Sequence, residues 1–135
     1  MLDVVPSIFA GCTASLSTED EELFRERYRR GASCMWTDSQ AARTDLALAS
    51  EVNPWVAEPP LLLGWLHLDA GCEAKARQCF ENALRLFVAW GTAWDKRLSW
   101  NEWISLGHTG YKSCQERLGR VGFDRTDMAN PPPSG

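Results

Sequence analysis

The chain has 135 residues, of which 44% are hydrophobic and 24% charged, and its formal net charge is −4. This composition is typical of one soluble globular domain, long enough to bury a core without disulfide or metal staples. The acidic net charge argues against a surface for nucleic acid or anionic membrane, and no apolar run is long enough to span a bilayer. Seven tryptophans are an unusually large number and favour a partner surface in addition to a core.

The first helical hairpin is predicted close to the N-terminus. Thr18 followed by Glu21 has the spacing of a capping box, and acidic residues in the first turn favour a helix that begins there. Apolar residues on one side continue this helix to Met35. The turn and N-cap signal of residues 37–39 then predicts a partner helix over residues 39–50.

The second hairpin is expected to open at Glu58, which two prolines follow at positions that suit the first turn of a helix. Residues 61–70 are almost wholly apolar, as expected of a helix that is buried on more than one side. Gly71 supplies a turn, and residues 73–89 form the predicted return helix.

A third helix is predicted from about Lys96 to Gly107 or Tyr111, followed by a short helix through Leu118. From Gly119 onward, Gly, Asp, Asn and a run of prolines predict a flexible tail. The expected parts are a weakly structured leader, a helical domain and a flexible Pro-rich tail, over residues 1–17, 18–118 and 119–135.

A pattern of small residues recurs once along the chain, 34 positions apart. The two copies are Ala42, Leu46, Ala49 and Pro54, and then Ala76, Phe80, Ala83 and Val88. Alanine at such positions lets two helix axes approach closely, because its side chain is small. A period of about 34 residues is typical of paired antiparallel helices. The pattern therefore predicts an all-α fold of antiparallel helical hairpins stacked as a short α-solenoid.

With these residues, the chain resembles the tetratricopeptide repeat (TPR) family. The matching positions are Leu63, Gly64, Gly71, Ala76, Phe80 and Ala83 in the second hairpin, Gly31, Ala42, Leu46, Ala49 and Pro54 in the first, and Trp103, Leu106 and Gly107 in a third. His67 departs from the tyrosine of the family. The resemblance covers roughly residues 20–118 and implies two to three repeats in a TPR-like arrangement with a protein-binding role.

In the TPR family the first helix of each hairpin lines a concave groove, and the resemblance implies which residues of this chain would do so. These residues are Tyr28, Met35, Trp36, Leu61, Leu62, Trp65, Leu68, Asp69, Asn101, Ile104, His108 and Lys112. Such an apolar and aromatic trough would suit an amphipathic helix or an extended hydrophobic segment of a partner. The alternative is that the apolar members simply form the core of a short, tightly curled bundle.

A second candidate surface is an aromatic patch formed by four tryptophans. They are Trp90, Trp94, Trp100 and Trp103. A helix through residues 97–104 would place two of these indoles on one face at a spacing of three residues. The alternative is that the indoles pack the extended turn between the second and third hairpins.

Catalytic and metal-binding chemistry finds little support in the sequence. The five cysteines are an odd number, widely spread and without a CxxC pair, which indicates reduced thiols. Cys72, Cys79 and His67 lack the closely spaced ligand pairs of a zinc site. Cys114 and His108 lack the orienting residue and oxyanion loop that a nucleophile would need. We therefore expect no enzyme activity, no metal and no cofactor.

The sequence predicts a non-catalytic protein–protein interaction module, such as an adaptor, an assembly factor or a small scaffold subunit, which binds an apolar or amphipathic segment of a partner protein. Helical repeats usually need about three units to bury a continuous core, so self-association is a further expectation. The alternative is a structural accessory subunit of a larger membrane-bound or organellar complex. The expected compartment is the cytoplasm or another reducing compartment, with an organelle as the alternative. Neither nucleic acid nor a direct membrane span is expected.

Overall fold

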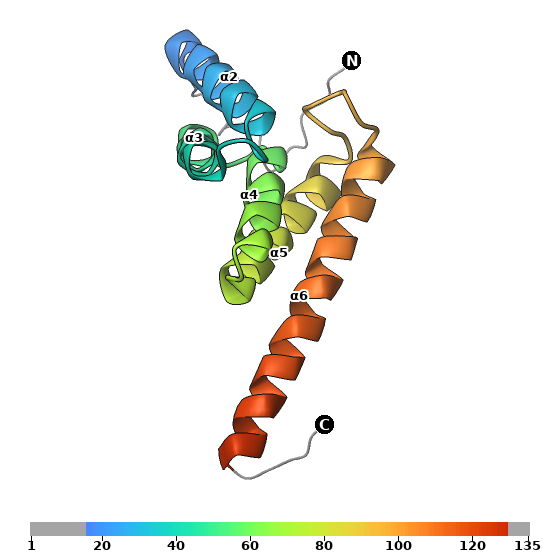
Figure 1. Cartoon of the computed structure of the whole chain (residues 1–135). Coiled ribbons are helices and arrows are strands. Elements are labelled where there is room, and N and C mark those ends of the chain that lie inside the picture. Colours follow the sequence, from blue (N-terminus) through green and yellow to red (C-terminus); the bar gives the residue numbers. More distant parts are fainter. Residues whose placement is uncertain (1–15, 130–135) are drawn as a thin grey trace.

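The computed structural model describes the backbone of residues 16–129 and the side chains of residues 16–118, so the predicted leader lies almost entirely outside it. Five helices follow one another along this part of the chain (Figure 1): α2 (Thr18–Ser33), α3 (Ser39–Val52), α4 (Glu58–Asp69), α5 (Glu73–Trp90) and α6 (Trp100–Ala129). No strand occurs between residues 16 and 129, and the predicted all-helical fold is confirmed.

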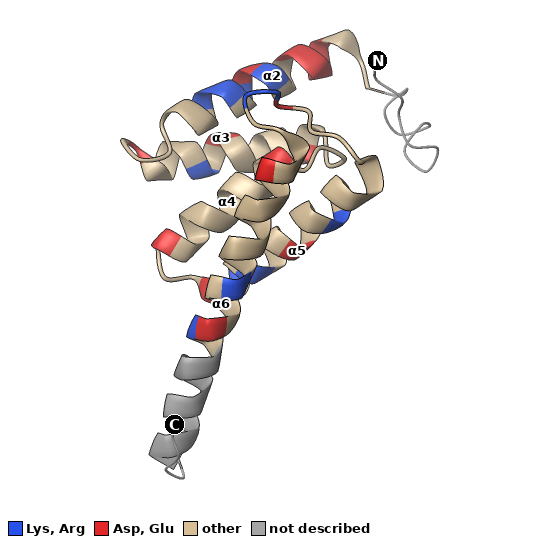
Figure 2. Ribbon diagram, turned by 90° about the vertical axis from the view of Figure 1, so that its right-hand side faces the viewer, with Lys and Arg blue, Asp and Glu red and all other residues tan. Residues whose placement is uncertain are grey.

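Each helix packs against the next one along the chain, and α4 also contacts α6. Figures 1 and 2 place α2 and α3 at one end of the α4–α5 pair, while α6 lies alongside α5. Helix α4 therefore has neighbours on several sides, and this arrangement explains its apolar sequence.

Side-chain hydrogen bonds determine where the first two helices begin. The Oγ of Ser17 accepts the N–H of Asp20 at 3.0 Å, so Ser17 caps α2 in place of the predicted Thr18. The carboxylate of Asp38 accepts the N–H of Ala41 at 3.2 Å and caps α3 as predicted. Both bonds satisfy N–H groups that have no partner within the helix.

Gly91 ends α5 because the backbone there turns left-handed, with a φ of +69° that other residues rarely adopt. Its N–H bonds to the carbonyl of Phe87 at 2.9 Å, and the chain then leaves the helix. We call residues 91–99 the α5–α6 loop. It separates the two long C-terminal helices and makes polar contacts with α2 and α4.

Helix α6 differs from the prediction at both ends. It begins at Trp100 rather than near Lys96, because Ser99 and Glu102 form a capping box. The N–H of Ser99 bonds to Oε1 of Glu102 at 2.8 Å, and the N–H of Glu102 bonds to Oγ of Ser99 at 3.1 Å. The helix continues to Ala129, whereas the sequence predicts a third helix and a separate short helix that ends at Leu118; residues 130–135 of the predicted flexible tail lie outside the described part.

The apolar residues form two clusters, and α4 contributes to both. One cluster joins α2 and α3 to α4 and includes Phe24, Leu46 and Leu66. The other joins α5 and α6 to α4 and includes Leu61 and Phe80. Figure 2 shows charged residues along α2 and none along the middle of α4. A helix that supplies core residues on opposite sides has to be apolar all round, as its sequence predicts.

The alanines of the repeated pattern lie where helices meet. Ala42, Ala49, Ala76 and Ala83 are all 0% exposed. The prediction that these small side chains are buried at close helix contacts is therefore confirmed. Gly31 serves the same purpose on α2, because a β-carbon at this position would lie only 2.7 Å from Cγ of Leu46.

Phe80 on α5 lies between two glycines from different helices. A β-carbon on Gly64 of α4 would come within 2.8 Å of the Phe80 ring, and one on Gly110 of α6 would come closer still. Real carbon atoms do not approach so closely, so both positions need glycine as long as the ring stays in place. This contact brings three helices together around a single side chain.

Replacing Gly110 with alanine should test this packing. Alanine normally stabilises a helix by about 1 kcal/mol relative to glycine. For Gly110→Ala we expect the opposite, a fall of about 1–3 kcal/mol in the free energy of unfolding, because the added methyl group overlaps the Phe80 ring. Urea unfolding followed by circular dichroism measures the change.

The exposed neighbour Thr109 supplies the control for that experiment. Thr109→Ala should change the free energy of unfolding by less than about 0.5 kcal/mol. A Phe80→Leu background should reduce the cost of Gly110→Ala, because the two substitutions act on one contact. A Gly110→Ala protein as stable as the wild type would contradict the described packing.

Candidate functional site

Four of the predicted groove residues belong to the core. Tyr28, Met35, Leu61 and Leu68 are exposed by only 0–6%. Helix α6 packs against α4, and the α5–α6 loop contacts Tyr28. These four side chains therefore cannot line an open groove, and for them the alternative core interpretation applies.

The other predicted groove residues are distributed over separate parts of the fold. Leu62, Trp65 and Ile104 are partly buried against the core. Trp36, Asp69, Asn101, His108 and Lys112 are exposed. Trp36 lies in the α2–α3 turn, Asp69 ends α4, and the remaining three lie on α6. Asn101 borders a shallow hollow at the start of α6, together with Leu98 of the α5–α6 loop and Leu106.

The four predicted patch tryptophans have two different roles. Trp103 is buried, and its indole N–H donates to the carbonyl of Asp95 at 2.8 Å. The indole N–H of Trp100 donates to the carbonyl of Phe87 at 2.8 Å. These two indoles fasten α6 to the loop and to α5. Trp90 and Trp94 instead border a cavity, so the four indoles do not form one exposed patch.

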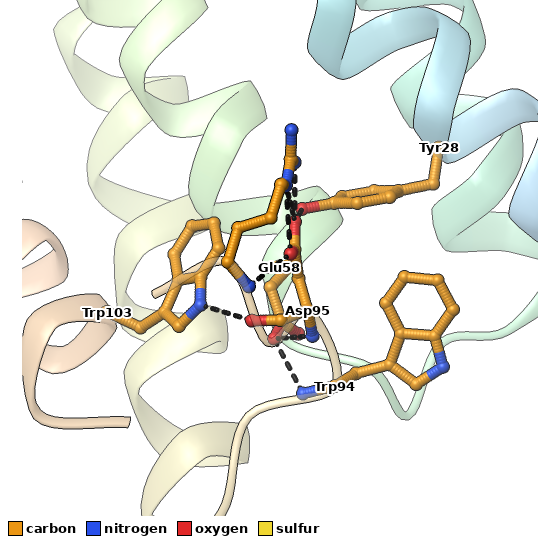
Figure 3. A network of polar contacts seen from close by, with 6 residues as sticks. Tyr28, Glu58, Trp94, Asp95 and Trp103 are labelled. Carbon is orange, nitrogen blue, oxygen red and sulfur yellow. Dashed lines mark hydrogen bonds and ion pairs between the residues drawn. The ribbon is translucent and has the colours of Figure 1, made fainter. Parts of the chain in front are cut away.

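The carboxylate of Glu58 holds the α5–α6 loop in place. Glu58 is the first residue of α4 and only 1% exposed. Its Oε2 accepts the backbone N–H groups of Trp94 and Asp95 at 2.7 and 2.8 Å (Figure 3). Because two backbone donors converge on one oxygen, the middle of the loop is fixed against the start of α4.

Asp95 extends this network to α2. The hydroxyl of Tyr28 donates to Oδ2 of Asp95 at 2.6 Å, across 67 positions of sequence (Figure 3). Nε of Arg97 lies 3.0 Å from both carboxylate oxygens of Asp95. Burial alone would raise the pKa of Asp95, but the hydrogen bonds from Arg97 and Tyr28 outweigh it and lower that pKa. Burial and the bond with Asp95 raise the pKa of Tyr28, so its hydroxyl keeps its proton and donates.

Glu58, unlike Asp95, has no arginine or lysine partner among residues 16–118. Asp95 pairs with Arg97, and the buried Asp45 pairs with Arg27 at 3.0 Å, but no ion pair made by residues 16–118 includes Glu58. Burial raises the pKa of Glu58 from 4.5 to about 7, although its backbone hydrogen bonds act in the opposite direction. The carboxyl group therefore titrates close to neutral pH.

A cavity of about 500 Å³ lies beside this network, between the start of α2, the α3–α4 connection, the end of α5 and the α5–α6 loop. Pockets of this size commonly hold small ligands or side chains. Four aromatic residues contribute to its walls: Phe24, Trp55, Trp90 and Trp94. Its charged lining residues are Glu21, Arg25, Glu58 and Lys96.

Trp94 is the aromatic residue of the cavity that reaches furthest into solvent, with 40% of its surface exposed. Its indole meets the rings of Phe24 and Tyr28 edge-on, with centroid separations of 5.0 and 5.3 Å. Its backbone N–H is held by Glu58. A large indole that is fixed in this way and still partly accessible is typical of the anchor residues in protein interfaces.

Several residues of this site were not predicted from the sequence, among them Phe24, Trp55 and Glu58. Glu58 does carry a recognisable signal, because it is a lone acidic residue at the start of a helix that is otherwise almost entirely apolar up to Asp69. A charge in that position predicts a buried carboxylate that needs donors from elsewhere. The donors themselves come from the α5–α6 loop, and no local pattern predicts that pairing.

The four described cysteines are free thiols, and Cys79 and Cys114 are partly or fully buried. Burial, followed by the neighbouring Cys114, raises the pKa of Cys79 to about 11, which disfavours the nucleophilic thiolate. Among the residues described by the structure, no three His, Cys, Asp or Glu side chains converge as metal ligands. No helix in the same part of the chain combines the length and apolarity needed to cross a membrane.

Comparison of the chain with protein-family models, curated proteins and solved structures gave no match. The function proposed for this chain therefore rests on the geometry of the site.

The free energy of unfolding should depend on pH through Glu58. A carboxyl group whose pKa rises on folding stabilises the protein fully below its unfolded pKa, and this stabilisation is lost as the pH rises through the folded value of about 7. We expect the wild type to lose roughly 2–3 kcal/mol between about pH 5 and pH 8 from this group. Burial lowers the pKa of His67, which has the opposite effect on the pH dependence.

The variant Glu58→Gln isolates this contribution, because glutamine keeps the size and an acceptor oxygen but cannot ionise. Urea unfolding at several pH values should show that the wild type loses more stability than Glu58→Gln as the pH rises. Parallel curves for the two proteins would rule out a raised pKa at Glu58.

Removing the Tyr28 hydroxyl should weaken the link between α2 and the loop. We expect Tyr28→Phe to lower the free energy of unfolding by about 1–3 kcal/mol, because Asp95 loses a buried hydrogen bond. Tyr111→Phe is the matched control, since its hydroxyl lies 3.4 Å from Glu81 at an exposed position. The control should cost less than about 0.5 kcal/mol, and equal effects in the two variants would contradict the proposed role of the network.

Proposed function

We propose that this chain is a non-catalytic protein–protein interaction module, and that its cavity beside Trp94 accepts an apolar side chain or short apolar segment of a partner. The observation that carries this proposal is the combination of a cavity of about 500 Å³ with several indole walls. Burying one large apolar side chain in such a space contributes about 2–3 kcal/mol to binding. Partly exposed tryptophans of this kind are frequent binding hot spots.

A TPR-like arrangement is part of the same proposal. It is supported by the buried alanines 34 positions apart, by the contact of Gly64 with Phe80 and by the consecutive packing of the helices. In such an arrangement α2, α4 and α6 would be the first helices of successive hairpins. The binding position would then differ from the concave groove of the family, because the α5–α6 loop contacts Tyr28, where a ligand would otherwise lie.

The polar rim of the cavity would orient the partner. Glu21, Arg25, Thr92 and Lys96 are exposed lining residues, and they surround the aromatic walls with groups that form hydrogen bonds. An apolar centre with a polar edge is the usual anatomy of a protein interface. As part of this proposal, the protein works in a reducing compartment. The described cysteines are free thiols, which supports that compartment.

Peptide selection tests this function and does not require the partner to be identified first. A random peptide library selected on the immobilised wild-type protein should enrich sequences with a large apolar or aromatic anchor. Titration calorimetry should then show that Trp94→Ala binds the enriched peptides at least about tenfold more weakly, because an anchor wall is lost.

Trp36→Ala is the matched control, because Trp36 is 67% exposed and lies in the α2–α3 turn outside the cavity lining. It should bind the peptides as the wild type does, and both variants should keep a cooperative thermal transition. A failure to enrich any sequence, or equal binding by Trp94→Ala and the wild type, would refute recognition at this cavity.

A further inference from the structure

Glu58 is a buried carboxylate that lines the cavity and pairs with no cation among the residues whose side chains the structure describes. It is 1% exposed and lines the cavity, and its Oε2 is bonded to two backbone N–H groups. Within residues 16–118 the other two buried acids, Asp45 and Asp95, each pair with an arginine. Backbone donors reduce the cost of burying a charge but do not neutralise it.

The walls next to this carboxylate suit a positive charge as well as an apolar group. Trp90 and Trp94 line the cavity together with Trp55 and Phe24. An ammonium or guanidinium group over the face of an indole is attracted by the ring electrons, and tryptophan is the most effective residue for this contact. A carboxylate beside several aromatic rings is therefore complementary to a cation that is carried on an apolar stem.

We propose that the cavity binds an ammonium or guanidinium group on an apolar stem, as presented by a lysine or arginine side chain within the apolar segment of the partner protein. This inference rests on the proposed function, because it names the chemical group recognised at the same cavity. The stem would pack against the indoles, and the charge would face the enclosed carboxylate of Glu58.

The charged groups around the cavity leave this position open to a cation. On α2, Glu21 and Arg25 are exposed at the rim. In the loop, the ammonium of Lys96 donates to the hydroxyl of Thr92 at 3.0 Å and to the carbonyl of Ala93. Arg97 and Tyr28 both donate hydrogen bonds to the carboxylate of Asp95. No lining residue of α5 is charged.

Binding of such a cation should depend on pH. Burial raises the pKa of Glu58 to about 7, so its ionised fraction rises about tenfold between pH 6 and pH 8. An alkylammonium ion stays protonated over this range. Its affinity should therefore rise with pH, whereas the affinity of a neutral molecule of the same shape should not.

Hexylamine and hexanol are suitable probes, because they share a stem and differ in charge. Each is titrated into the wild-type full-length chain near pH 6 and near pH 8, while the indole N–H signals are followed by NMR. We expect hexylamine to bind about tenfold more tightly at the higher pH and more tightly than hexanol there. The affinity for hexanol should change by less than about twofold.

Glu58→Gln should remove both the pH dependence and the preference for hexylamine, while Glu21→Gln at the rim should keep them. The comparison of the two pH values in the wild type needs no variant to fold. Equal binding of the two probes, or loss of the preference in Glu21→Gln alone, would overturn the inference that the ligand is cationic. The proposal that the cavity binds an apolar group would remain. Indole signals that respond to neither probe would overturn this inference and also the assignment of the cavity as a binding site.

Discussion

The hydrogen bonds of Glu58 to the backbone of Trp94 and Asp95 determine the course of the α5–α6 loop, and the candidate site depends on that course. With the loop held against the start of α4, Asp95 reaches Tyr28 and Trp94 packs on Phe24. The same contacts leave a cavity between the loop and the surrounding helices. Burying a carboxylate costs desolvation free energy, which a neutral side chain in the same position would avoid.

The helices themselves are held by a different kind of constraint, which is close packing around small residues. Phe80 fits between Gly64 and Gly110, and the buried alanines allow the remaining helix contacts. Helix α4 joins the two apolar clusters, so neither α2 with α3 nor α5 with α6 has a separate core. This rigid framework gives the loop a fixed surface on which to pack. The aromatic walls can then be preorganised, which lowers the cost of ordering them when a ligand binds.

Much of the fold could be predicted from local patterns. The caps and the apolar spacing located four helices to within a few residues, because those signals act over one or two turns. The start of α6 was misplaced because Asp95 and Arg97 look compatible with a helix but are used by the loop. The groove prediction treated Tyr28 and Leu61 as accessible, although contacts from distant parts of the chain bury them. The cavity could not be predicted, since its walls come from four segments whose approach depends on the pairing of Glu58 with the loop.

The bond between Tyr28 and Asp95 spans 67 positions and connects the first described helix to the segment that precedes the last. In helical arrays whose units touch only their neighbours, the outer units can unravel one at a time. Here the outermost pair, α2 and α3, is fastened to a loop that α4 and α6 also hold. Detaching that pair would expose Phe24, Trp94 and two buried acids together. The part of the chain from α2 to the start of α6 should therefore unfold as a single unit, with amide protons of α2 and of α4 protected to similar degrees.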